Sequence, residues 1–148
     1  MRIAIACDHA GFPLKAAVTE VVNSAGHQVF DFGTDSTEPV DYPDVVERAC
    51  RALQKSEVDR AIILCGSGIG AAIAANKLKG VYACVCHDSY SAAQGVEHDN
   101  MNTLSLGARV IGVEVARACV LAFLGAEFST EERHRRRVSK IRILEQEG

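Results

Sequence analysis

The chain has 148 residues, and its 16 basic and 19 acidic side chains leave a formal charge of −3 at pH 7. This length corresponds to one domain, which excludes a two-domain dehydrogenase or kinase. The small negative charge excludes a general attraction to nucleic acid or anionic lipid, and no apolar run approaches the ~20 residues of a membrane span. We therefore expect a single soluble domain over residues 1–148 with no nucleic-acid or membrane partner.

Short β-rich runs alternate with stretches of helical period, an order typical of βαβ units and a parallel sheet. The expected strands cover residues 2–7, 28–32, 60–64, 81–86 and 103–106. The first expected helix starts near Pro13 and stops at Gly26, the next cover 41–56, 70–77, 89–96 and 113–124, and a charged helix begins near Thr130. The pattern predicts a Rossmann-like, three-layer α/β sandwich with a five-stranded parallel sheet and an extra C-terminal helix.

The six cysteines lack the pattern of a disulfide framework or a metal site. A chain of this size needs no covalent crosslinks and its first residues are not those of a signal peptide, so we expect reduced thiols in the cytoplasm. Cys84 and Cys86 lie two apart on an expected strand and share one face, where both are expected in the core. No cysteines and histidines have zinc-ligand spacing, so we expect no metal or other cofactor.

The most distinctive local feature is Cys65-Gly66-Ser67-Gly68-Ile69-Gly70, in which a thiol ends a strand and three glycines lead into a helix. Glycines allow backbone N–H groups to point inward, and a helix N-terminus adds partial positive charge, so the turn can bind a phosphate, a carboxylate or an oxyanion. The same field favours the thiolate form of a cysteine, which can act as a base or a nucleophile. The turn also lies at the sheet edge where ligands bind.

Two other interpretations of this turn remain open. A free cysteine is often only a buried, space-filling residue. The spacing Gly66-x-Gly68-x-x-Ala71 also matches a dinucleotide-binding fingerprint, with Asp88, 22 residues after Gly66, in the place of a ribose-binding acid. That fingerprint belongs on the first strand of its unit, whereas here it follows the third strand, which argues against a dinucleotide site.

Other polar residues gather near the ends of expected elements. Asp8 and His9 follow the first strand, where they can transfer protons or bind polar groups, although Asp8 can equally cap the next helix. His98 precedes the fifth strand in the polar run HDNMN, which is typical of a solvated loop. Arg133 and Arg137 share a helical face and can hold a phosphate together, or they can form an ordinary solvated basic surface.

Together these residues resemble the ribose-5-phosphate isomerase B family, which includes the galactose-6-phosphate isomerase subunits, over nearly the whole chain. The motifs that carry the resemblance are CDHAG after the first strand, DYP at 41–43, ILCGSGIG at 63–70, AANK at 74–77, the His98 segment, LGARV at 106–110 and RHRRRV at 133–138. The resemblance implies a metal-free aldose-ketose isomerase that acts on a phosphorylated sugar through an enediolate. The expected sugars are ribose 5-phosphate and ribulose 5-phosphate.

The resemblance also implies a role for each matching residue. Cys65 takes the proton from the carbon beside the carbonyl, and the amides of Gly66, Gly68, Ile69 and Gly70 hold the developing oxyanion. Ser67, where the family often has threonine, shuttles protons between the two sugar oxygens, and Asp8 and His98 assist ring opening. The implied substrate-binding residues are His9, Tyr42, Asp99, Arg109, Arg133 and Arg137, of which His9, Arg133 and Arg137 hold the phosphate.

Two features bear on specificity and assembly. Family members commonly follow this histidine with Asn-Asp, whereas this chain has Asp99-Asn100, and a carboxylate accepts hydrogen bonds but cannot donate them as an amide does. Because His98 follows a helix and precedes a strand, it should lie at the sheet edge opposite Cys65, so a neighbouring chain must supply it. We therefore expect a homodimer with shared active sites, or a dimer of dimers built from it.

Two alternative functions are kept beside this one. The first is the same chemistry on another sugar phosphate, such as allose 6-phosphate, galactose 6-phosphate or a tetrulose phosphate. The second is a non-catalytic module that binds a nucleotide on the glycine loop. Formation of a ketose without added nucleotide or metal would separate an isomerase from such a module.

Overall fold

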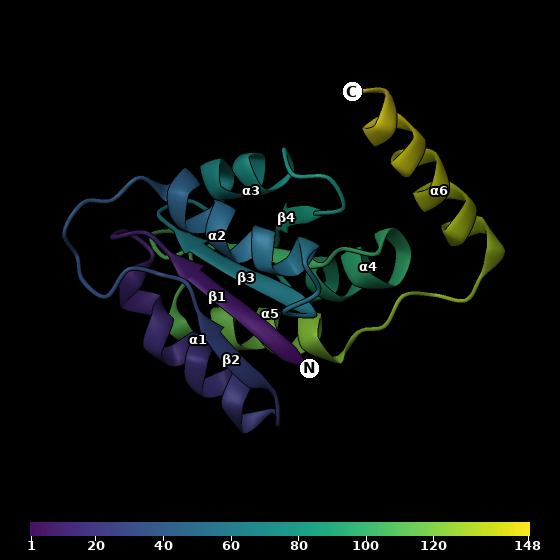
Figure 1. The fold of residues 1–148 in the computed structure, drawn as a ribbon. Coiled ribbons are helices and arrows are strands. Elements are labelled where there is room, and N and C mark those ends of the chain that lie inside the picture. The colour runs from purple at the N-terminus through teal and green to yellow at the C-terminus, as the bar shows by residue number, and fades with distance from the viewer.

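Five strands and six helices alternate along the chain in a computed structural model that describes residues 1–148 (Figure 1). The strands are β1 (Arg2–Cys7), β2 (Gln28–Asp31), β3 (Arg60–Cys65), β4 (Ala83–Val85) and β5 (Thr103–Gly107). The helices are α1 (Phe12–Ser24), α2 (Tyr42–Gln54), α3 (Ile69–Ala75), α4 (Ser89–Asp99), α5 (Val113–Gly125) and α6 (Glu132–Glu147). The strands form one parallel sheet in the order β2-β1-β3-β5-β4, which confirms the predicted α/β class.

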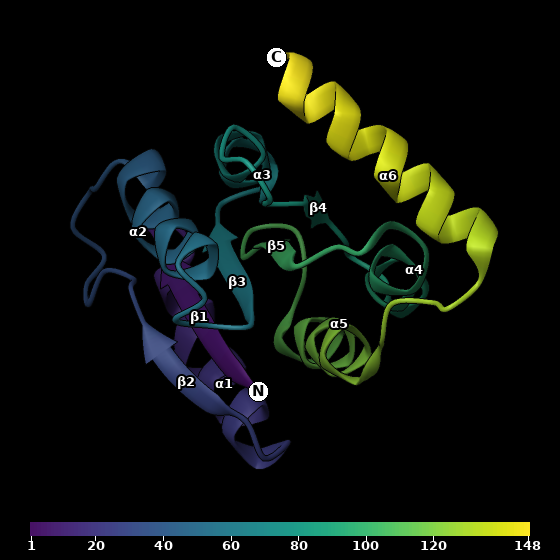
Figure 2. The ribbon, with the colours of Figure 1, turned by 45° about the vertical axis from the view of Figure 1, so that its right-hand side comes forward.

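Helices cover both faces of this sheet, because successive side chains of a strand point to opposite sides. Ile3 and Ile5 of β1 pack toward α1, α4 and α5, whereas Ala4 and Ala6 pack toward α2 and α3. Figure 2 shows the two groups of helices on either side of the strands. The two cores leave β1, β3 and β5 buried on both faces, as expected of a three-layer sandwich.

The strand order places a crevice between the carboxyl ends of β1 and β3, because the chain crosses to one side after β1 and to the other after β3. Cys7 is in register with Leu64, and the backbone N–H of Asp8 donates to the Leu64 carbonyl at 3.2 Å. Asp8 therefore leaves its strand beside the last residue of β3, Cys65. The parallel pairing is what brings these two residues together.

The edge strand β4 is shorter than the sequence pattern predicts, and one of its cysteines is not in the core. The strand covers Ala83–Val85 and pairs only with β5. Cys86 is buried, with its sulfur 4.0 Å from that of Met101, but Cys84 is exposed. The expectation that both cysteines are core residues is therefore wrong for Cys84, because an edge strand lacks a neighbour on one side.

Helix α4 is longer than predicted and includes His98 and Asp99 in its last turn. The helix stops at Asn100, which adopts a left-handed conformation with a φ of 54° and donates its N–H to the Val96 carbonyl. Asparagine tolerates this conformation well, so it can end a helix as glycine does. The expectation that His98 belongs to a solvated loop is therefore wrong.

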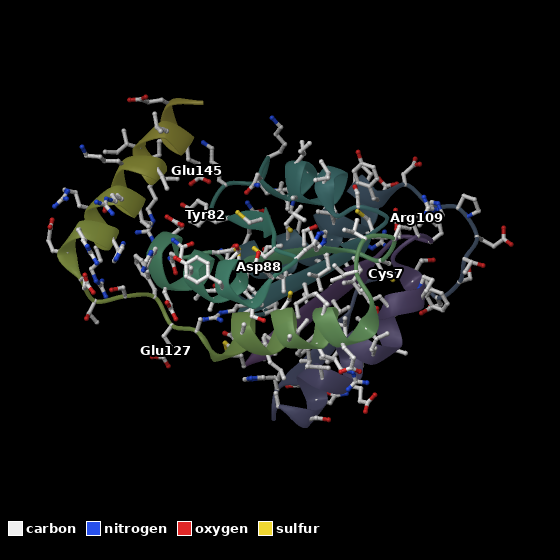
Figure 3. The ribbon with its side chains drawn as sticks, turned by 180° about the vertical axis from the view of Figure 1, so that it is seen from behind. Cys7, Tyr82, Asp88, Arg109, Glu127 and Glu145 are labelled. Atoms are coloured by element: carbon white, nitrogen blue, oxygen red, sulfur yellow. The ribbon has the colours of Figure 1, made fainter.

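Helix α6 extends away from the sheet and packs against α4 through its first half (Figures 1 and 2). His134 and Val138, one turn apart, are its only buried residues. Near its end, Glu145 accepts a hydrogen bond from the backbone N–H of Gly80 at 2.7 Å, and Tyr82 lies beside the same carboxylate (Figure 3). None of the six helices combines the length and the apolar character required to span a membrane.

Candidate active site

A pocket of about 370 Å³ opens at the carboxyl ends of β1 and β3. Its lining residues are Asp8, His9, Ala10, Tyr42, Cys65, Gly66, Ser67, Gly70, Arg109 and Val110. Eight of these ten are residues that the sequence singled out, all but Ala10 and Val110. Gly68 and Ile69, which the sequence also singled out, belong to the same glycine loop and begin α3. The structure thus brings together residues from three strand ends and from the start of α2.

The Cys65 sulfur is held below the glycine loop as a hydrogen-bond acceptor. The backbone N–H of Gly68 donates to Cys65 Sγ at 3.0 Å, and the side chain is buried. Gly68 reaches this position with a φ of 82°, a left-handed conformation that favours glycine. A sulfur that accepts an N–H is better suited to carry negative charge than one surrounded only by apolar groups, because a hydrogen bond to an ionised partner is the stronger one.

The other cysteines are held in the thiol form. Burial raises the pKa of Cys7 and of Cys50 from 9.0 to about 11, and that of Cys86 to about 12. Burial also raises the pKa of Cys84 and of Cys119. These five thiols are therefore overwhelmingly protonated at neutral pH and are poor bases or nucleophiles.

Asp8 and His9 continue β1 into the pocket, and each has one defined partner. The Asp8 carboxylate accepts the backbone N–H of Gly11 at 2.9 Å, so it does support the turn before α1 while it also lines the pocket. His9 Nδ1 accepts the backbone N–H of Val40 at 3.2 Å. A backbone N–H can only donate, so the neutral ring carries its own proton on Nε2 and can donate it to a ligand.

Tyr42 and Arg109 form the outer walls of the pocket. The Tyr42 ring lies so close to Gly70 that a Cβ on this glycine would stand 2.6 Å from Tyr42 Cζ, which explains a glycine at the start of α3. The backbone N–H of Arg109 donates to the Gly66 carbonyl at 3.0 Å. Its guanidinium takes part in none of the ion pairs of the chain. Arg109 is therefore free to bind an anion.

The remaining candidates do not line this pocket. His98 stacks on His134 of α6, with ring centroids 3.9 Å apart and an angle of 12° between the planes. The amide nitrogen of Gln94 lies 2.9 Å from His98 Nδ1, so the neutral His98 ring has its proton on Nε2. Asp99 lies beside His98 on α4, and Arg133 and Arg137 flank His134 on α6. Figure 3 shows Arg109 at the opposite end of the molecule from α6.

The α4–α6 contact, defined here as His98, Asp99, Arg133, His134 and Arg137, concentrates positive charge around a buried imidazole. Burial lowers the pKa of His134, and His98 and Arg133 lower it further. The Nε2 atom of His134 is buried without a hydrogen-bond partner. Arg133 pairs with Glu131 at 2.9 Å, whereas Arg137 is exposed and takes part in none of the chain's ion pairs.

Two residues in or next to these sites were not singled out from the sequence. His134 appeared only within the motif RHRRRV at 133–138, and nothing local in the sequence indicates that its ring stacks on a residue of another helix. Ser105 was read only as part of a strand, although its hydroxyl donates to the Gly68 carbonyl at 2.7 Å. A signal for Ser105 was present, because it is a polar residue inside the otherwise apolar run Leu104–Leu106 of a strand buried on both faces.

The dinucleotide interpretation of the glycine loop is not supported by the strand order. In that arrangement the ribose-binding acid follows the strand adjacent to the glycine-rich turn. Asp88 follows β4, which β5 separates from β3. Its carboxylate accepts the backbone N–H of Ser91 at 2.6 Å and caps α4. Asp88 is therefore a helix cap at the end of a strand that is not adjacent to β3.

Comparison with known proteins agrees with the geometry of the pocket. A family model described as Ribose/Galactose Isomerase matches residues 3–141. The chain is 42% identical over 145 residues to ribose-5-phosphate isomerase B of Escherichia coli, covering 98% of this chain and 97% of that one. It is also 42% identical over 130 residues to D-erythrulose-4-phosphate isomerase of Pectobacterium atrosepticum, covering 86% and 85%.

Solved structures give the same result. The type B ribose 5-phosphate isomerase of Trypanosoma cruzi superposes with a TM-score of 0.97 at 41% identity, over the full length of both chains. A parallel α/β domain with a thiol, a carboxylate and an imidazole around a glycine loop is thus the architecture of a sugar-phosphate isomerase. The chain belongs to the ribose/galactose isomerase family.

Proposed function

We propose that the protein interconverts ribose 5-phosphate and ribulose 5-phosphate, with Cys65 as the base. The observation that carries this proposal is the hydrogen bond from the Gly68 N–H to Cys65 Sγ in a pocket that also contains Asp8 and His9. The near full-length similarity to ribose-5-phosphate isomerase B supports this choice of sugar.

The reaction moves two protons and leaves no net redox change. The Cys65 thiolate takes the proton from C2 of the open-chain aldose, and the electron pair moves toward O1 to form an enediolate. The amides of the glycine loop stabilise the oxyanion, since donors fixed in a buried site cost no reorganisation. The thiol then returns its proton to C1, while the Ser67 hydroxyl carries the O2 proton toward O1.

Before this step the sugar ring must open, which requires an acid and a base at the ring oxygen and the anomeric hydroxyl. Asp8 and His98 are proposed for these roles. His9 offers its Nε2 proton, and Arg109 and Arg137 offer guanidinium groups that have no carboxylate partner. Together with Arg133 they are proposed to bind the sugar and its phosphate.

We propose that the site is completed by a second copy of the chain. His98, Asp99, Arg133 and Arg137 lie on α4 and α6, and none of them lines the Cys65 pocket. A homodimer in which each α4–α6 contact faces the partner's pocket would unite all of the proposed residues. Its symmetry would create two equal sites.

All six cysteines are free, which fits a reducing compartment such as the cytoplasm.

Mixing two inactive variants tests both the chemistry and the shared site. Cys65→Ala and His98→Ala should each lose nearly all ribose 5-phosphate isomerisation, measured as ketose formation. After subunits are exchanged, half of the dimers are hybrids with one intact site, so roughly a quarter of the original activity should return. If each site lies within one chain, the mixture stays inactive, because every chain carries a lesion.

A tetrulose phosphate is the strongest second candidate, since a D-erythrulose-4-phosphate isomerase has the same 42% identity to this chain over 130 residues. Comparing kcat/KM for ribose 5-phosphate, allose 6-phosphate, galactose 6-phosphate and erythrulose 4-phosphate decides between them. Asp99→Asn belongs in the same series, because it replaces an acceptor-only group with an amide. The ribose assignment is wrong if another sugar has the higher kcat/KM.

A further inference from the structure

Ser105 is a buried hydroxyl in the middle of the sheet. It lies on β5 between Ile63 of β3 and Val85 of β4, and its side chain is inaccessible to solvent. A buried hydroxyl is unfavourable unless it forms a hydrogen bond. The Ser105 hydroxyl has one partner, the Gly68 carbonyl, at 2.7 Å.

Gly68 links this hydroxyl to the reactive sulfur. Its carbonyl accepts from Ser105 and from the backbone N–H of Ala72, and its own N–H donates to Cys65 Sγ at 3.0 Å. The Ser105 hydroxyl therefore fixes the carbonyl of Gly68, and the N–H of the same residue contacts the Cys65 sulfur. A Cβ on Gly68 would stand 3.2 Å from Ser105 Oγ, so the two residues are closely packed.

We propose that Ser105 is a positioning residue that keeps the Gly68 N–H directed at the Cys65 sulfur. The proposal rests on the function assigned above to Cys65. The bond from Gly68 strengthens when the sulfur becomes negative, because a hydrogen bond to an ionised acceptor is about twice as strong as a neutral one. Loss of the Ser105 hydroxyl therefore disfavours the thiolate more than the thiol, although Ser105 touches neither the sulfur nor the pocket.

The matched control is on the same strand. Thr103 is two residues earlier on the same face of β5 and is equally buried, but its hydroxyl contacts Asn102 at 3.4 Å and not the glycine loop. Ser105→Ala and Thr103→Val each remove one buried hydroxyl from β5. Only Ser105→Ala removes the bond to Gly68.

The first measurement is the rate of alkylation of Cys65 by iodoacetamide as a function of pH, followed by mass spectrometry of the Cys65 peptide. Ser105→Ala should shift this pH profile toward alkaline pH and slow alkylation at pH 7 about fivefold, the size expected of one hydrogen bond. The pH profile of alkylation in Thr103→Val should match that of the wild-type protein. Identical profiles for all three proteins would overturn the proposal.

The second measurement is turnover of ribose 5-phosphate. Ser105→Ala should lower kcat about fivefold with KM unchanged, since the hydroxyl does not meet the sugar. An equal loss in Thr103→Val would reduce the role of Ser105 to packing and would overturn the proposal. Alkylation does not require turnover. If the wild-type protein does not isomerise the sugar, the proposed function is wrong. The alkylation profiles still decide the role of Ser105 in that case.

Discussion

The Cys65 pocket and the α4–α6 contact hold the two halves of the proposed site, and they are built in opposite ways. The pocket is made of strand ends and a glycine loop, and its sulfur is buried and hydrogen-bonded by the backbone. The α4–α6 contact joins two helices through stacked imidazoles, and its arginines are exposed. One half therefore presents a buried thiol fixed by the backbone, and the other presents an exposed, positively charged surface around a histidine stack.

The largest expected effect separates the two thiols that end neighbouring strands. Cys65→Ala should lower kcat by about 10³-fold while the protein still binds the sugar, because a positioned base acts chiefly in the transition state. Cys7→Ala is the matched control, since Cys7 is as buried but its sulfur faces the Thr34 carbonyl at 3.6 Å. Steady-state kinetics and equilibrium binding check both variants. Comparable losses of kcat in the two variants would contradict the assignment of Cys65 as the base.

The second prediction addresses the arginines of α6. Arg137→Ala should raise KM for the sugar phosphate about tenfold, because a charge-assisted bond to phosphate is lost. The control is Arg136→Ala on the same helix, whose guanidinium is paired with Glu132 at 2.5 Å. A smaller fall in kcat is also expected for Arg137→Ala, because remote binding energy supports turnover. Equal KM values in the two variants would place the phosphate elsewhere.

The sheet and the Cys65 pocket could be predicted because their signals are local or follow from parallel pairing. Strands β1 and β3 are continuous apolar runs, and their carboxyl ends must meet, which places Asp8 beside Cys65. The extent of α4 could not be predicted, since it depends on Asn100 adopting a left-handed conformation. The stack of His98 on His134 could not be predicted either, because it joins two helices far apart in sequence.

The third prediction concerns the stability of the fold in alkali, through Cys50 of α2. Burial raises the pKa of Cys50 from 9.0 to about 11, so between these values the unfolded chain loses a proton that the folded chain keeps. The free energy of unfolding should therefore fall as the pH rises, by about 1 kcal/mol per such thiol at pH 10. Urea unfolding at pH 8 and pH 10 checks this. Cys50→Ala should show a smaller fall, and the same fall in both proteins would contradict the assignment.

The smallest expected effect is a weaker docking of α6 at acid pH, which we expect from His134 in the α4–α6 contact. The pKa of His134 is lowered from 6.5 by burial first, and then by His98, Arg133 and Arg137, while Glu131 opposes them. Between 6.5 and that lowered value, a detached α6 binds a proton that the docked helix excludes. Docking should therefore weaken as the pH falls through this range and be fully present above it.

Hydrogen exchange in α6 should accordingly be a few-fold faster at pH 5.5 than at pH 7.5, after correction for the intrinsic pH dependence of exchange, while the sheet amides remain protected. His134→Phe keeps a flat ring against His98 but cannot take a proton, so it should remove most of this dependence. If α6 in that variant is as acid-sensitive as in the unmodified protein, another group controls docking.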